Sequence, residues 1–175
     1  MNSGSSADDV QTIRSGTIAV EGQSSPGLKT NSMDLTKSYP RSPRERLGGI
    51  PMLPRTIDKA RAAIAGTLGE YKYGESSDFD MYLFETLGVD AESFLDGVRR
   101  SPDDAAVLRW LHANARTVAE RDDERLLETL ERDGVDSDDG RAQLDKWTEK
   151  NVPPPLRARI RSWVDKLDFD EGRIT

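Results

Sequence analysis

The stretch SDFDMYLFETLGVDAESFLDGVRRSPDDAAVLRWLHAN, residues 77–114, carries signals that begin and end helices at short intervals. Ser77 and Asp90 each precede a segment with apolar residues at helical spacing, and such side chains accept hydrogen bonds from the free N–H groups of a first helical turn. Gly88 ends the first segment, and Ser-Pro-Asp-Asp at 101–104 opens the third. The stretch therefore predicts three consecutive helices, over 77–88, 90–100 and 101–114.

The segments on the C-terminal side repeat this pattern. Gly134 closes a predicted helix over 117–133, and a further helix is predicted over 138–150. A run of three prolines at 153–155 separates it from a last helix that reaches Leu167. We predict this last helix as one continuous unit because its apolar residues form one stripe at about 100° per residue, namely Leu156, Ile160, Trp163, Val164 and Leu167.

The segments on the N-terminal side complete the prediction. Ser42-Pro43-Arg44-Glu45 has the form of a capping box and predicts a short first helix that Gly48-Gly49 stops. Pro54 opens a second helix, predicted to run to Leu68. The alternation typical of strands is weak along the chain. The predicted fold class is therefore all-α, a single compact domain of about seven or eight short helices.

Composition excludes several classes of protein. A chain of 175 residues, of which 35% are apolar and 33% charged, is long enough for one domain with a hydrophobic core. It has no apolar run near the ~20 residues that a membrane span needs, so we expect a cytoplasmic protein without a membrane segment. The absence of cysteine excludes disulfides, thiol nucleophiles and cysteine-ligated zinc or iron–sulfur sites.

Residues 1–32 differ from the rest of the chain. They are rich in Ser, Gly and Thr and carry too few apolar residues to offset chain entropy, so we predict a disordered leader. Met33 followed by Asp34 leaves a second interpretation open, in which the native chain starts at Met33 and residues 1–32 are a misassigned start. In both cases the predicted helical domain spans 33–175.

Charge is unevenly distributed. The net charge of the chain is −7, but residues 34–74, called the basic block below, sum to +4, whereas residues 75–150 sum to −11. An acidic surface repels nucleic acid in general. Any role in binding an anion is therefore expected in the basic block or in the last helix.

Several short motifs of the basic block occur in a recognisable order. They are DLTK at 34–37, YPRSPRE at 39–45, LPRTIDKAR at 53–61 and GEY at 69–71, followed near the chain end by DEGR at 170–173. The arrangement resembles an uncharacterised bacterial family that carries only a domain-of-unknown-function label. The resemblance implies a compact cytoplasmic domain that begins near Met33. It implies no reaction, and it transfers no catalytic residue.

The basic block is the best candidate for a functional site. Arg41 and Arg44 lie at the start of the first predicted helix, and Arg55, Thr56 and Lys59 lie in the opening turns of the second. Unpaired N–H groups and the helix dipole suit a phosphate or carboxylate at such positions. Two interpretations stay open: a binding module for a small anionic ligand or an acidic partner segment, and a clasp whose cations pair with the acidic 75–150 segment.

A second set of residues is predicted to form a structural ion pair. Arg61 lies at the margin of the apolar face of the second predicted helix, where a charge requires a partner. Asp58 is three residues earlier, and Glu70 follows the helix, so either carboxylate is a suitable partner.

An enzyme is the alternative class of function. The arginines would then position a phosphorylated or carboxylated small molecule, and Glu70, Tyr71 or His112 would transfer protons. His112 is the single histidine, so a metal site built on several histidines is excluded. The acidic run at 133–140 has Lys146 where a calcium loop requires a glutamate. We therefore predict no metal and no cofactor. A helix-turn-helix over 42–67 is disfavoured, since Ala62 and Ala63 offer little to read bases.

Overall fold

The computed structural model describes residues 33–117 and 120–175, and the predictions for residues 1–32 lie outside these ranges. Helices dominate the described residues, which confirms the all-α class, and the sheet found there is one short hairpin. In chain order the elements are β1 (Arg46–Leu47), β2 (Ile50–Pro51), α1 (Leu53–Ala65), η1 (Gly74–Ser76), α2 (Asp78–Leu87), α3 (Ala91–Arg100), α4 (Asp104–Asn114), α5 (Asp123–Arg132), α6 (Asp138–Asn151), η3 (Pro154–Arg159) and α7 (Trp163–Asp170).

The three helices predicted from residues 77–114 are confirmed as α2, α3 and α4. Ser77 caps α2 by accepting a hydrogen bond from the N–H of Asp80, and Gly88 ends that helix with a left-handed φ of 66°. Asp90 caps α3, and Asp103 caps α4. Local capping chemistry thus sets the boundaries of these helices.

The short first helix was a wrong prediction, because residues 46–51 form the β1–β2 hairpin instead. One half of the capping box does form, since the N–H of Ser42 donates to Glu45 Oε1 at 3.2 Å, but the Ser42 hydroxyl accepts from the N–H of Arg44 rather than from that of Glu45. Gly48 and Gly49 have φ values of 59° and 87°, and two such residues favour a two-residue hairpin turn over a helix stop. The helix-turn-helix over 42–67, which the sequence already disfavours, does not form either, because a hairpin stands where its first helix would lie.

Three further boundaries differ from the prediction. The last helix is divided, because Ser162 starts α7 with a full capping box in which Ser162 and Asp165 exchange side-chain and backbone hydrogen bonds. The proline-led segment before it forms the 3-10 helix η3. The other two differences are single helix ends. Helix α1 ends at Ala65 rather than Leu68, and α5 begins at Asp123 rather than near residue 117.

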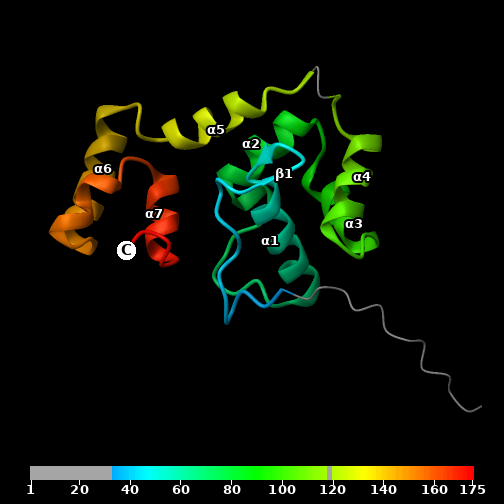
Figure 1. Ribbon diagram of the computed structural model, residues 1–175, viewed down its shortest axis with the longest axis horizontal. Helices are drawn as coiled ribbons and strands as arrows, with labels where there is room; N and C mark the ends of the chain where they lie inside the picture. The colour runs from blue at the N-terminus through cyan, green and yellow to red at the C-terminus, as the bar shows by residue number, and fades with distance from the viewer. Residues whose placement is uncertain (1–32, 118–119) are drawn as a thin grey trace, which may run out of the picture.

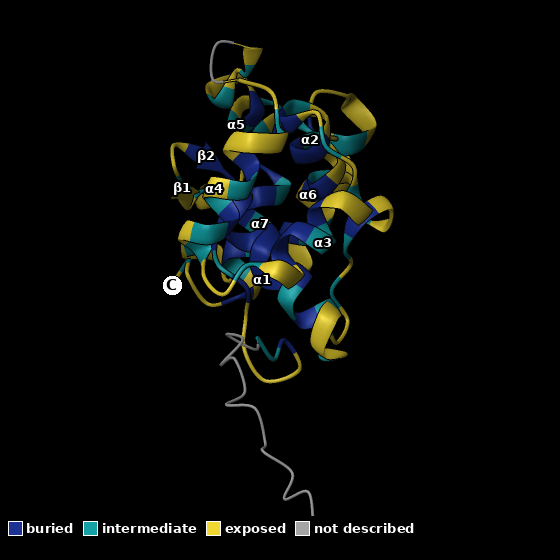
Figure 2. Cartoon of the chain, turned by 90° about the vertical axis from the view of Figure 1, so that its right-hand side faces the viewer, coloured by how far each residue is buried: buried dark blue, intermediate teal, exposed yellow. Residues whose placement is uncertain are grey.

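The apolar side chains form two clusters. The main one joins β2, α1, α2, α3, α4 and α5, and Val164 of α7 also belongs to it. The second cluster lies among α6, η3 and α7 and includes Leu144, Trp147 and Phe169. Figure 1 shows α6 and α7 on one side, α1 to α4 on the other and α5 running between them, and Figure 2 shows buried residues on the inner faces of the helices.

We call residues 134–175 the C-terminal body. It begins at Gly134 because this residue packs against Gly140 of α6 and Trp163 of α7. A Cβ built on Gly140 would lie only 1.6 Å from the carbonyl oxygen of Gly134, and a Cβ on Gly134 would lie 3.0 Å from Trp163 Nε1. The turn before α6 is therefore packed as part of this body. Within the described ranges, no helix has both the length and the apolar character to cross a membrane.

Candidate functional site

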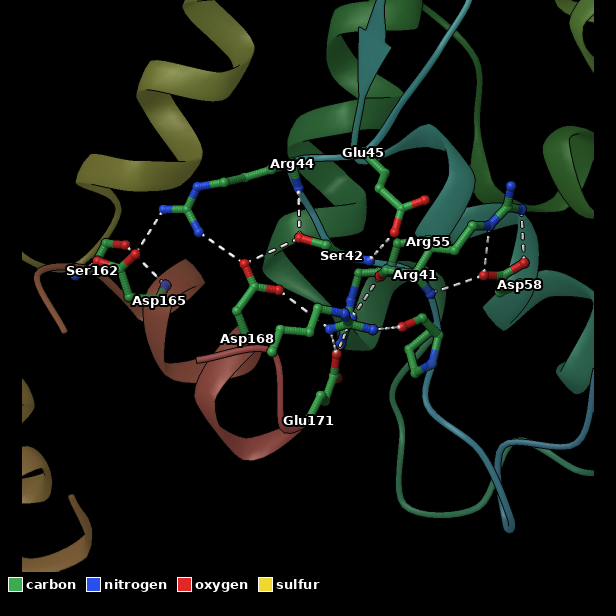
Figure 3. Close-up of polar contacts among 12 residues, drawn as sticks. Arg41, Ser42, Arg44, Glu45, Arg55, Asp58, Ser162, Asp165, Asp168 and Glu171 are labelled. Carbon is green, nitrogen blue, oxygen red and sulfur yellow. Dashed lines mark hydrogen bonds and ion pairs between the residues drawn. The ribbon is translucent and has the colours of Figure 1, made fainter. Parts of the chain in front are cut away.

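One side of α7 faces the basic block with carboxylates. Asp165, Asp168 and Glu171 follow one another at intervals of three residues, a spacing that places side chains on the same side of a helix. Trp163 and Phe169 contact the second apolar cluster instead. The helix is thus amphipathic, with an acidic side toward the basic block, and Figure 3 shows the arginines of the block reaching these carboxylates. We call this contact the seam.

Arg55 and Glu171 form the most buried ion pair of the seam. Arg55 donates from both terminal nitrogens, at 2.9 Å to Oε2 and 2.7 Å to Oε1, and each side chain is only 3% exposed. Tyr71 donates its hydroxyl to Oε1 at 3.2 Å. Burial acts to raise the pKa of Glu171, but the hydrogen bonds and positive charges of Arg55 and Arg173 together outweigh it and hold that pKa below its ordinary value. Burial, together with the Glu171 charge, raises the pKa of Tyr71 to about 12.

Arg44 joins the basic block to α7 and α5. Its guanidinium lies 2.9 Å from both Asp165 and Asp168 and 3.1 Å from Glu131. Ser42 Oγ also donates to Asp168, at 3.1 Å. Burial acts to lower the pKa of Arg44, but the surrounding carboxylates raise it above its ordinary value. Arg44 is therefore a permanently charged connector between two parts of the chain.

Arg41 and Arg61 share carboxylates within the main body. Arg41 binds Asp58 at 2.8 Å and Asp104 at 2.6 Å, and Arg61 binds Asp104 at 2.7 Å. The expected pairing of Arg61 with Asp58 or Glu70 is thus corrected, because Asp104 of α4 is its partner and Glu70 is exposed. Only the tertiary fold brings the start of α4 next to α1.

Lys59 and Thr56 meet at a buried carboxylate. Lys59 Nζ lies 2.7 Å from Asp80, and Thr56 donates its hydroxyl to the same carboxylate at 3.0 Å. The backbone N–H of Gly74 donates to its other oxygen at 3.1 Å. Burial lowers the pKa of Lys59, and Asp80 opposes that effect. These contacts attach α1 to α2.

Most of the predicted ligand residues therefore bind carboxylates of the chain itself. Arg41, Arg55, Thr56 and Lys59 are held in this way, and Arg44, which also binds carboxylates, borders an open hollow. Sequence reasoning placed the acidic partners in residues 75–150 and missed the carboxylates of α7. The detectable signal was the spacing of three residues among those carboxylates on a helix with an apolar opposite side.

The hollow beside Arg44 lies at the seam and has a volume of about 380 Å³. Arg44, Arg159 and Arg161 line it together with Glu131 and Asp165. Arg159 and Arg161 belong to the C-terminal body and are exposed. Three arginines and two carboxylates thus line the hollow, and a third carboxylate, Asp168, also holds Arg44. We call this hollow the seam hollow.

The candidates for proton transfer are not assembled around this hollow. Tyr71 contacts Glu171, whereas Glu70 and His112 are exposed. Their role in an enzyme stays a prediction. In residues 33–117 and 120–175, no group of three or more acidic or histidine side chains is arranged to hold a metal ion.

The contacts of the seam involve the motifs quoted from the sequence. Arg41 to Glu45 come from YPRSPRE, Arg55 to Arg61 from LPRTIDKAR and Glu171 from DEGR. A comparison with curated proteins finds no match. A family model described as a domain of unknown function, DUF5069, matches residues 37–173, a range that contains the whole seam. Because this match covers most of the chain, the protein belongs to the DUF5069 family.

Proposed function

We propose that this protein is a binding module that takes an anionic group in the seam hollow. In this proposal the remainder of the basic block is a clasp that attaches α7 to α1. The observation that supports it is the meeting of Arg44 with Arg159 and Arg161, which come from distant parts of the chain and line one hollow together.

The chemistry of the three arginines suits a phosphate or a carboxylate. A guanidinium presents its donors in a planar fork that matches two oxygens of such a group. Asp165 and Asp168 hold Arg44 in place, so little of its side-chain entropy remains to be lost on binding. The side chain of Arg161 is exposed, so it can turn toward a ligand, whereas Arg159 would first release the hydrogen bond that it donates to the main-chain oxygen of Thr175.

The first test is calorimetric titration of the full chain with inorganic phosphate, and with acetate as the carboxylate probe, at constant ionic strength. We expect saturable binding of at least one anion. Arg161→Ala should weaken it about tenfold or more, because a hydrogen bond to a charged group contributes about 1.5–3 kcal/mol.

Arg99→Ala is the matched control, since Arg99 is an exposed arginine of α3 whose ion pair with Asp96 lies outside the hollow. This variant should bind as the unmodified chain does. Equal loss in both variants would indicate an unspecific charge effect, and unchanged binding by Arg161→Ala would remove the hollow from the proposal.

A further inference from the structure

The seam is held mainly by polar contacts, although it joins two apolar clusters. Val164 is the member of α7 that packs into the main cluster. The other contacts of α7 with the basic block are polar: Asp165 and Asp168 of α7 bind Arg44. Just after α7, Glu171 binds Arg55 and Arg173 donates to the carbonyl oxygen of Pro40. Such an interface loses few apolar contacts when it opens, and water can hydrate the charges that it releases.

The C-terminal body has an apolar cluster of its own, although α7 also packs against α5, outside this body. The cluster includes Leu144, Val152, Ile160 and Trp147, which α6, η3 and the segments after them contribute. The contact of Gly134 with Gly140 joins the preceding turn to α6. This body can therefore keep its internal packing while its contact with the basic block is lost.

The seam hollow has walls on both sides of this interface. Arg44 belongs to the basic block and Glu131 to α5, whereas Arg159 and Arg161 belong to the C-terminal body. An anion that contacts Arg44 and Arg161 together would connect the two sides. Opening of the seam would separate these arginines and destroy the site.

We infer that the C-terminal body opens from the rest of the chain as one unit, and that an anion bound in the seam hollow holds it closed. This inference rests on the proposed function for its ligand. The opening itself rests on the two apolar clusters and the polar seam. Binding to the closed form alone stabilises that form by mass action, in proportion to the occupancy of the site.

The test is amide hydrogen exchange of the full chain, with and without inorganic phosphate, at constant ionic strength. Without phosphate, α6 and α7 should share one level of protection that is lower than that of α1, because they exchange through opening of the seam. At ten times its dissociation constant, phosphate should slow exchange in α6 and α7 about tenfold.

Two variants separate the ligand from the clasp. Arg161→Ala should abolish the effect of phosphate and leave the protection without phosphate unchanged. Glu171→Gln should lower the protection of α6 and α7 more than that of α1, because Arg55 loses its ionised partner. If Glu171→Gln does not fold, Asp168→Asn serves the same purpose, since its contacts with Arg44 and Ser42 are less buried.

Each result decides a separate point. Equal protection of α1, α6 and α7 would overturn the inference, because the chain would then open only as a whole. Calorimetric binding of phosphate without slower exchange in α6 and α7 would overturn the role of the anion and leave the proposed function standing. Absence of phosphate and acetate binding would overturn both the proposed function and the inference that an anion holds the body closed. The difference in protection between α1 and the pair α6 and α7 would still show whether the body opens as one unit.

Discussion

At the scale of single residues, this protein buries several charges and neutralises each one with a specific partner. Arg55 and Glu171 are 3% exposed, and the Lys59 and Asp80 side chains are 4% and 0% exposed. An ion pair of this kind is not itself strong evidence of stability, because desolvation of both groups opposes their attraction. Loss of one partner is strongly destabilising, since the remaining charge stays buried without an opposite charge.

Arg55→Ala should lower the free energy of unfolding by about 3–5 kcal/mol, because it leaves Glu171 without its bidentate partner. Arg99→Ala, which removes a pair that is half exposed on α3, should lower it by at most about 1 kcal/mol. Urea unfolding of both variants measures the difference. An equal, small effect would mean that water reaches Glu171 and that the clasp contributes little.

The pKa of Glu171 predicts how stability depends on pH. This pKa is lower in the folded chain than in the unfolded one, and Arg41 and Arg61 likewise outweigh burial to lower the pKa of Asp104. The unfolded state therefore binds protons first as the pH falls, so stability is fully present above the unfolded value and decreases from about pH 5 downward.

Glu171→Gln should start from a lower stability at pH 7 and lose less of it between about pH 5 and pH 3, because one titrating group is gone. Urea midpoints across this range measure the slope. The same slope in both proteins would assign the acid sensitivity to other carboxylates.

At the scale of elements, capping residues set the helix boundaries, and the steric fit of side chains sets how closely two helices pack. Gly97 lies inside α3, where alanine is normally the better helix former. A Cβ there would lie 2.5 Å from the ring of Trp110 on α4. The glycine therefore lets the indole rest on the α3 backbone and brings the two helices close together.

Gly97→Ala should consequently destabilise the protein by about 1–3 kcal/mol, since overpacking outweighs the gain of about 1 kcal/mol in helix propensity. Glu92→Ala is the control, because Glu92 is an exposed residue of the same helix and its replacement should change stability by at most about 0.5 kcal/mol. Thermal unfolding compares the two. A stabilised Gly97→Ala variant would mean that Trp110 moves away without loss.

At the scale of the whole molecule, α7 combines two kinds of contact. Its apolar side completes the second cluster, and its acidic side meets the basic block. Segments separated by more than 100 residues, such as Arg55 and Glu171, are joined in this way. The motifs that carry the family resemblance are therefore distant in the sequence and neighbours in the fold.

The fold class and the ends of α2, α3 and α4 could be predicted from the sequence, because capping residues, glycine and helical periodicity act within a few residues. The sequence also identified the arginines of the basic block as an unusual concentration of charge. It did not predict the hairpin at 46–51, since the same Ser-Pro-Arg-Glu contacts fit a turn as well as a helix, and the Gly48-Gly49 signal was assigned to the wrong element.

The carboxylate that each cation binds depends on the tertiary structure and could not be predicted from the sequence. Asp104 rather than Asp58 or Glu70 is the partner of Arg61, and Glu171 is the partner of Arg55. The physical reason is that helix caps and periodicity depend on neighbours in sequence, whereas a buried charge selects whichever opposite charge the packing of distant helices brings within a few ångströms. The seam and its hollow arise in the same way, from the docking of α7 against the basic block.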